Sequence, residues 1–300
     1  MPDSVLLDLP TPIALVCHDA GATNLLFAWM RAHAAVLPDA TRDWRLLAQG
    51  PAAKLWTERG LPQIRIVQTI DEILDGAAIL VSGTGWASDL EYDARAAARA
   101  RGIRSQAVID HWVNYRERFI RHGQLVLPDE IVVTDIYALE EAKRCFPDLP
   151  VRLRSNLYLQ EMAEMIAPLT DQVDGILYVL EPIRNHWGRA QAGEFQALDY
   201  FAENFVRVVP DKDYPIRLRP HPSDPPGKYD AWIAAHPELK VAIDQNDSLA
   251  AAIGHARWIV GAETFAMVVA LAAGRQVIST LPPWAHRCRL PHPAIIHLRE

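Results

Sequence analysis

The chain has 300 residues, of which 50% are hydrophobic and 22% are charged, and its formal net charge is -7. This composition predicts a folded globular protein with room for two domains and excludes intrinsic disorder. The acidic balance offers no general attraction for nucleic acid or for an acidic membrane. A phosphate-bearing ligand would therefore need a local binding site.

The three cysteines, Cys17, Cys145 and Cys288, are far apart and form no CxxC pair. Their spacing argues against a disulfide framework and a cysteine-ligated zinc ion, and it is typical of a reducing cytoplasm. Residues 1–12 contain no basic segment followed by an apolar run, so we expect no signal peptide. No apolar stretch reaches the length of a membrane span, so we expect no integral membrane segment.

From Ile13 onwards, short β-branched runs alternate with segments of helical periodicity, which predicts an α/β fold on parallel strands. In the first half we expect strands at 13–17, 44–48, 64–67, 78–82, 104–109, 130–134 and 151–153. The helices expected between them cover 24–36, 52–59, 89–101 and 136–146.

In the second half we expect strands at 175–180, 216–219, 240–243, 258–260 and 276–279. The helices expected here cover 190–208, 229–235, 248–255 and 264–273, and a helix within 156–170 bridges the halves. The pattern predicts two Rossmann-like domains, residues 1–160 and 161–300, that face each other across a cleft. Ligands of such folds bind at the carboxyl ends of the strands.

The first polar segment at a predicted strand end is HDAGATN, residues 18–24. Asp19 is suited to act as a general base toward a hydroxyl group, with His18 beside it to tune it. Gly21 permits a close approach of the backbone. The alternative is that Asp19 or Thr23 simply caps the following helix.

The segment SGTGWAS, residues 82–88, also follows a predicted strand. Its glycines and Thr84 could line a polar pocket. Ser88 and Glu91, by contrast, have the spacing of a helix capping box.

The segment DHWVNYRER, residues 110–118, follows the next predicted strand. Asp110 is a second candidate for acid–base chemistry, and Trp112 and Tyr115 could stack on a sugar or a base. The alternative is that Asp110 pairs with Arg116 or Arg118 where the two domains meet.

In the second half, Arg217 and Arg219 alternate along a short predicted strand and so lie on one face. His221 follows between Pro220 and Pro222, which restrict it to an extended conformation. A restrained imidazole beside guanidinium groups suits recognition of a phosphate leaving group. The alternative is a proline-rich surface turn.

The turn from Gly261 to Thr264 connects a predicted strand to a helix. Its backbone N–H groups and the Thr264 hydroxyl would hold a phosphate at the helix N-terminus. Glu263 could hold a ribose hydroxyl. The alternative is that Thr264 is an ordinary N-cap.

Three histidines near the C-terminus, His286, His292 and His297, lack the helical spacing of zinc enzymes. We therefore expect no metal site there.

The RPHP segment and the GAETFAMVVALAAG segment together resemble the donor-binding half of GT-B-type glycosyltransferases. More narrowly, they resemble bacterial sialyltransferase-like, capsule-polymer and glycerophosphotransferase-like enzymes. In those families the histidine of the HP pair and the hydroxyl turn engage the phosphate of a CMP- or CDP-activated donor, roles that fall here on His221 and Thr264. The resemblance implies an acceptor-side domain at 1–160, with the acidic base at Asp19, and a nucleotide-donor domain at 161–300.

We therefore expect a metal-independent enzyme without a cofactor that moves a sugar or related group from a nucleotide-activated donor to a hydroxyl of a glycan or small-molecule acceptor. Asp19 would deprotonate the acceptor, while Arg219, His221 and Thr264 stabilise the departing phosphate. Surface polysaccharide or glycoconjugate synthesis is the expected setting.

Two alternatives stay open from the sequence. One is a nucleotide-sugar 2-epimerase of the same layout, with acid–base carboxylates from Asp19, Asp110 and Glu181. The other is a nucleotide- or glycan-binding module without catalysis.

Overall fold

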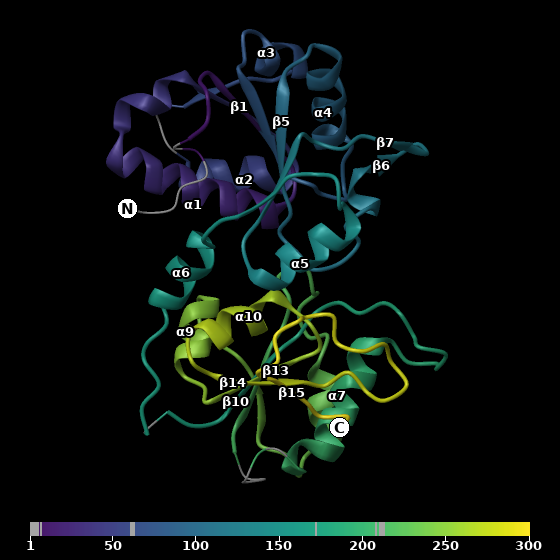
Figure 1. Ribbon diagram of the computed structural model, residues 1–300. Helices are drawn as coiled ribbons and strands as arrows, with labels where there is room; N and C mark the ends of the chain where they lie inside the picture. The colour runs from purple at the N-terminus through teal and green to yellow at the C-terminus, as the bar shows by residue number, and fades with distance from the viewer. Residues whose placement is uncertain (1–5, 7, 61–63, 172, 208, 210–213) are drawn as a thin grey trace. The chain divides into compact units, whose positions relative to one another are not determined.

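The computed structural model describes residues 6, 8–60, 64–171, 173–207, 209 and 214–300 (Figure 1). The chain divides into two units, Met1–Tyr158 and Leu159–Glu300, and we describe each by itself. Helix α6 (Leu157–Glu164) crosses this division. Val208, the last residue of one helix expected from the sequence, lies outside the described residues.

The first unit is built on a parallel sheet of seven strands in the order β3-β2-β1-β4-β5-β8-β9. These strands are β1 (Ile13–Cys17), β2 (Trp44–Ala48), β3 (Arg65–Ile66), β4 (Ile79–Ser82), β5 (Arg104–Val108), β8 (Glu130–Val133) and β9 (Val151–Leu153). Every residue of β1 and β4 is buried, since helices cover both faces of the sheet. That double burial explains why the central strands are continuous apolar runs.

The helices of the first unit are α1 (Ala20–Val36), α2 (Gly50–Arg59), α3 (Ile70–Leu74), α4 (Leu90–Ala100) and α5 (Ile136–Cys145). A small antiparallel hairpin, β6 (Ile120–Arg121) with β7 (Gln124–Leu125), stands apart from the main sheet (Figure 1). Alternate residues of β1 serve two cores. Ile13, Leu15 and Cys17 pack with α1, and Ala14 and Val16 pack with α3 and α4.

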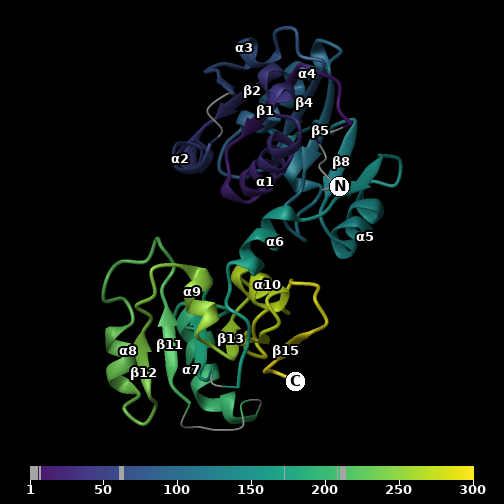
Figure 2. The same cartoon turned by 90° about the vertical axis from the view of Figure 1, so that its left-hand side faces the viewer.

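The second unit is built on a parallel sheet of six strands in the order β12-β11-β10-β13-β14-β15 (Figure 2). The strands are β10 (Ile176–Val179), β11 (Ile216–Arg219), β12 (Val241–Ile243), β13 (Trp258–Gly261), β14 (Gln276–Ser279) and β15 (Ile295–His297). The helices are α7 (Gly193–Asn204), α8 (Asp230–Ala235), α9 (Leu249–Gly254) and α10 (Phe265–Ala272). Short 3-10 helices cover Pro38–Asp43, Glu117–Phe119 and Phe205–Arg207.

The predicted α/β class with two Rossmann-like halves is confirmed. Strands β1, β2, β9, β11 and β14 have the bounds expected from their sequences. Helix α1 begins at Ala20, four residues before the predicted Asn24, because Asp19 rather than Thr23 is its N-cap. The short elements α3, β6, β7 and β15 were not predicted.

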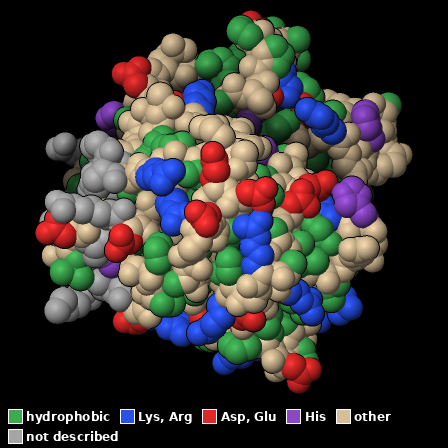
Figure 3. All heavy atoms as spheres, turned by 90° about the horizontal axis from the view of Figure 1, so that it is seen from above, with side chains coloured by type: hydrophobic (Ala, Val, Ile, Leu, Met, Phe, Trp, Pro, Cys, Tyr) green, Lys and Arg blue, Asp and Glu red, His purple; other side chains and the backbone are tan. Residues whose placement is uncertain are grey.

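Among the described residues, no helix is both long and apolar enough to cross a membrane. On the face shown in Figure 3, lysine and arginine side chains are interspersed with aspartate and glutamate. A surface of mixed sign concentrates no positive field for a polyanion.

Candidate functional site

The two residues that follow β1, His18 and Asp19, form a hydrogen-bonded pair. Asp19 is the N-cap of α1, yet its side chain makes no capping hydrogen bond. Its Oδ1 lies 2.7 Å from Nδ1 of His18, and its Oδ2 accepts a hydrogen bond of 2.7 Å from the backbone N–H of Trp86. The capping alternative therefore does not account for the Asp19 carboxylate.

The pair defines the tautomer of His18. A carboxylate only accepts hydrogen bonds, so the ring hydrogen of His18 is on Nδ1 and the lone pair of the neutral imidazole is on Nε2. Thr23, the other capping candidate, uses its hydroxyl to donate to the Asp19 carbonyl oxygen at 2.6 Å.

Two glycines leave space around this pair. A Cβ atom built on Gly50, whose φ is +55°, would lie 2.5 Å from Nε2 of His18. A Cβ atom built on Gly85 would lie 2.3 Å from Oδ2 of Asp19. Any side chain at either position would displace the pair, so these glycines keep room beside the atoms that could exchange a proton.

Glu91 holds the loops after β1 and β4 together from the interior. Its side chain accepts hydrogen bonds from the backbone N–H groups of His18, at 3.0 Å, and of Gly85. Burial raises the pKa of Glu91 above its usual value, although these two hydrogen bonds act in the opposite direction. The predicted capping box is wrong: Asp89 is the N-cap of α4, and only Ser88 accepts a local hydrogen bond, from the N–H of Leu90.

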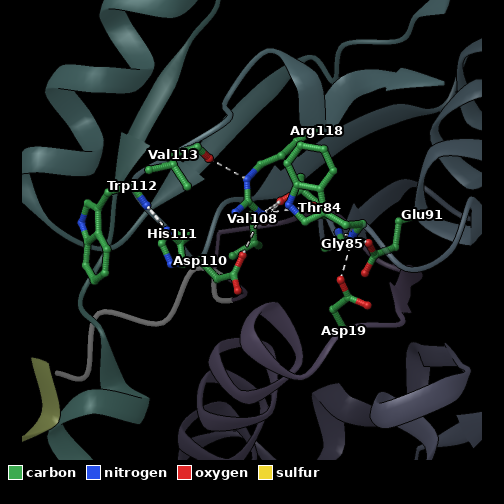
Figure 4. Close-up of polar contacts among 12 residues, drawn as sticks. Asp19, Thr84, Gly85, Glu91, Val108, Asp110, His111, Trp112, Val113 and Arg118 are labelled. Atoms are coloured by element: carbon green, nitrogen blue, oxygen red, sulfur yellow. Dashed lines mark hydrogen bonds and ion pairs between the residues drawn. The ribbon is translucent and has the colours of Figure 1, made fainter. Parts of the chain in front are cut away.

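Asp110, after β5, is the second carboxylate at this edge of the sheet (Figure 4). Its Oδ1 lies 3.1 Å from the Arg118 guanidinium, which is 5% exposed and also donates to the Thr84 carbonyl oxygen at 3.2 Å. The ion-pair alternative is thus confirmed, and it lies within the first unit. A Cβ atom on Gly21 would lie 1.7 Å from Oδ2 of Asp110, so the carboxylate packs against the first turn of α1.

The expectation that Trp112 and Tyr115 stack together on a ligand is wrong for Tyr115. That side chain is 2% exposed, and its hydroxyl donates to the Ala138 carbonyl oxygen at 3.3 Å. The indole N–H of Trp112 donates to the Asp135 carboxylate at 2.8 Å. Both aromatic residues therefore hold the loop after β5 onto the α5 region.

In the second unit, His221 has the opposite tautomer to His18. Its Nδ1 accepts a hydrogen bond from the backbone N–H of Ser223 at 3.2 Å, with the Ser223 hydroxyl 2.7 Å away. The hydrogen of the neutral ring is therefore on Nε2, where it is a donor for an anion. The backbone N–H of His221 donates to Oδ2 of Asp224 at 3.0 Å, which fixes the turn.

Three charged side chains brace the His221 turn. The Lys228 ammonium lies 2.7 Å from Oδ1 of Asp224 and 2.6 Å from Oε1 of Glu194, and these carboxylates are 3% and 8% exposed. Oε2 of Glu194 accepts from the backbone N–H of Ile183 at 2.9 Å. The network joins the loops that follow β10 and β11.

Arg217 and Arg219 share one face of β11 as predicted, but both bind Asp244. The Asp244 carboxylate has 0% exposure and lies 3.3 Å from the Arg217 guanidinium and 2.5 Å from that of Arg219. Arg217 also donates to the His255 carbonyl oxygen at 2.7 Å, and Arg219 to that of Asn246 at 2.9 Å. The arginines neutralise a buried carboxylate, so they need no phosphate to explain them, contrary to the expected role.

The turn after β13 is already occupied by carboxylates. The backbone N–H of Glu263 donates to Oε1 of Glu181 at 2.6 Å, and Thr264 is the N-cap of α10, as its capping alternative predicted. Burial raises the pKa of Glu181 to about 7. Burial also opposes ionisation of Glu263, but hydrogen bonds from Arg289 and His286 hold its pKa below the usual value.

The Glu263 carboxylate therefore pairs with Arg289 and His286, and its expected contact with a ribose hydroxyl stays a prediction. Across the described ranges, no group of three or more histidine, cysteine, aspartate or glutamate side chains could hold a metal ion.

No protein-family model and no curated protein gives a significant match to the sequence. Among solved structures, the chain is similar to the UDP-GlcNAc 2-epimerase of Methanocaldococcus jannaschii, with 12% identity and a TM-score of 0.59 over 89% of this chain and 83% of that one. It is also similar to the UDP-GlcNAc 2-epimerase of Neisseria meningitidis bound to UDP-GlcNAc, with 10% identity and a TM-score of 0.57 over 93% and 84%.

A third similar structure is that of the wall teichoic acid polymerase TagF, with 12% identity and a TM-score of 0.50 over 98% of this chain and 78% of that one. Identities this low establish the fold and leave the reaction open. The chain therefore has a GT-B-like fold of two Rossmann-like halves, while the narrower resemblance to sialyltransferase-like enzymes stays a prediction.

Proposed function

We propose that the chain is an enzyme that transfers a sugar or related group from a nucleotide-activated donor to an acceptor hydroxyl. The observation that carries the proposal is the different partner of each Nδ1 atom, a carboxylate for His18 and a backbone N–H for His221, from which opposite tautomers follow. Each histidine follows a parallel strand, where α/β folds place their ligands. One presents an Nε2 lone pair that takes a proton, and the other an Nε2–H that binds an anion.

In the first unit, His18 and Asp19 act as one acid–base group. The acceptor hydroxyl loses its proton to Nε2 of His18, and its oxygen bonds to the transferred group. Asp19 stabilises the imidazolium that forms. From the sequence we expected Asp19 to be the base and His18 to tune it. The proposal exchanges these two roles, because both Asp19 oxygens already accept hydrogen bonds.

In the second unit, His221 binds the leaving group. The bond between the transferred group and the donor phosphate oxygen breaks, and its electron pair stays on that oxygen. Nε2–H of His221 donates to the developing anion. The Asp224 contact and the Lys228 network hold the ring in place before the charge develops.

The structural comparisons support a nucleotide-sugar substrate, since two of the proteins that share the fold are named for UDP-GlcNAc. The setting we propose is the cytoplasmic synthesis of a surface polysaccharide or glycoconjugate. Three free cysteines, Cys17, Cys145 and Cys288, agree with that compartment.

The first test is a thermal-shift panel of CMP, CDP, UDP, UDP-sugars and GDP-sugars. A nucleotide that binds the folded state raises the melting temperature, and the shift grows with the logarithm of its concentration above the Kd. His221→Ala should abolish that shift or lower turnover of the identified donor by at least about a hundredfold. A chain that responds to none of these nucleotides contradicts the donor assignment, as does unchanged turnover in His221→Ala.

A 2-epimerase is the second candidate, favoured by the two carboxylates that flank the first turn of α1, Asp19 and Asp110. Incubating the identified donor without acceptor separates the two reactions. An epimerase rearranges or releases the sugar under those conditions, whereas a transferase requires the acceptor. Stabilisation without any product would instead indicate a binding module.

A further inference from the structure

An exposed tryptophan adjoins the His18–Asp19 pair. Trp86 lies in the loop between β4 and α4 and is 47% exposed. Its backbone N–H donates to Oδ2 of Asp19 at 2.7 Å. The backbone of the loop that carries the indole is therefore held against the proposed acid–base pair.

Two guanidinium groups hold the indole in place. The central carbon of the Arg118 guanidinium lies 5.7 Å from the ring centroid, and that of Arg121 lies 5.9 Å from it. Both arginines are fixed in turn, since Arg118 pairs with Asp110 at 3.1 Å and Arg121 pairs with Asp89 at 2.9 Å. The indole is thus a supported platform with an open surface.

The charges near the platform favour an uncharged ligand. The two guanidinium groups are balanced by Asp110 and Asp89, and the Asp19 carboxylate adds a negative charge beside the backbone of Trp86. A phosphate or carboxylate ligand would meet repulsion there. Hydroxyl groups, by contrast, donate readily to carboxylate oxygens.

We propose that Trp86 is the stacking platform for a neutral sugar ring of the acceptor. The C–H groups on one face of a pyranose carry partial positive charge and pack against the negative face of the indole. This places a saccharide hydroxyl at the His18–Asp19 pair. The inference rests on the role that the proposed function gives to that pair, and it names the acceptor as an uncharged saccharide.

The test is binding of the full chain to a printed array of neutral and acidic glycans. Trp86→Ala should lower the signals of neutral glycans about tenfold, while Trp86→Phe retains most of them because it retains a ring. The alanine variant keeps the backbone N–H that binds Asp19. The matched control is Trp284→Ala, since Trp284 is 40% exposed and also lies against an arginine, Arg189, at 3.5 Å.

Four results would overturn the inference: unchanged signals in Trp86→Ala, equal losses in Trp284→Ala, binding of acidic glycans only, or no glycan bound by the wild type. The nucleotide panel reports independently on the donor. A chain that binds neutral glycans through Trp86 but no nucleotide retains this inference and contradicts the donor assignment. A chain that binds nucleotides but recognises glycans without Trp86 contradicts this inference and retains the donor assignment.

Discussion

Nδ1 of His18 and Oδ1 of Asp19 lie 2.7 Å apart, and this contact alone decides which nitrogen of the imidazole can take a proton. In Asp19→Asn the side-chain amide can donate to Nδ1, which moves the ring hydrogen to Nε2 and removes the base. We expect turnover of the identified donor to fall about a hundredfold to ten-thousandfold, as for other general bases.

Because the pair acts as a unit, His18→Gln should cost a similar factor, and the double variant should be no worse than either single variant. Steady-state turnover with saturating donor measures all three. His255→Gln, an exposed histidine of the second unit, is the control and should keep full activity. If turnover in the double variant fell by the product of the two single-variant factors, the two residues would act separately.

The space beside Nε2 of His18 gives a second prediction. Gly50→Ala introduces a Cβ atom 2.5 Å from Nε2, and Gly102→Ala introduces one with nothing within 4 Å. Both glycines have positive φ, +55° and +68°, so both variants carry a similar backbone strain of about 1 to 2 kcal/mol.

Chemical denaturation should therefore show a loss of stability for Gly102→Ala and at least as large a loss for Gly50→Ala, while only Gly50→Ala loses turnover. Equal activity in both would mean that the space beside His18 is not used.

Strand-end positions were predictable from the sequence, but the partners of several residues were not. Asp19 and His221 were identified because apolar runs reveal where parallel strands end. Glu91 was misread because its local spacing matches a capping box, and only the fold brings His18, 73 positions away, to its carboxylate.

The partner of the two arginines of β11 could not be predicted from the sequence either. Their shared face follows from strand periodicity, whereas their partner Asp244 lies just after the neighbouring strand β12 and becomes visible only once the strand order is known. Nor could the sequence reveal that Lys228 connects two strand-end loops, since Glu194 and Asp224 come from different elements.

The third prediction concerns the contribution of Lys228 to stability. Its ammonium is 18% exposed and contacts two buried carboxylates, whose hydrogen bonds and charges raise its pKa despite the opposing effect of burial. Lys228→Met leaves both carboxylates without their cation, which should lower the free energy of unfolding by about 3 to 5 kcal/mol.

The matched surface pair is Arg144 with Glu141, in which the arginine is 72% exposed, so Arg144→Met should cost far less stability than Lys228→Met. Urea denaturation measures both variants. Similar losses would contradict the assignment of Lys228 as the brace of the His221 turn.

Glu181 makes the stability of the second unit depend on pH. Burial raises its pKa from 4.5 to about 7, so the folded state binds a proton that the unfolded state releases at lower pH. The contribution of this proton to the free energy of unfolding is fully present below pH 4.5 and is lost as the pH rises through 7. Glu181→Gln stays neutral, and its amide oxygen can still accept the hydrogen bond from the Glu263 N–H.

We therefore expect Glu181→Gln to melt near the wild-type temperature below pH 4.5 and above it beyond pH 7, with the difference growing between these values. Thermal melts across pH 4 to 9 measure the difference. Glu58→Gln, at an exposed position on α2, is the matched control for replacing a carboxylate by an amide. A constant difference for Glu181→Gln would mean that the carboxyl has the same pKa in the folded and unfolded states and is ionised above pH 4.5, where a phosphate at that turn would meet its negative charge.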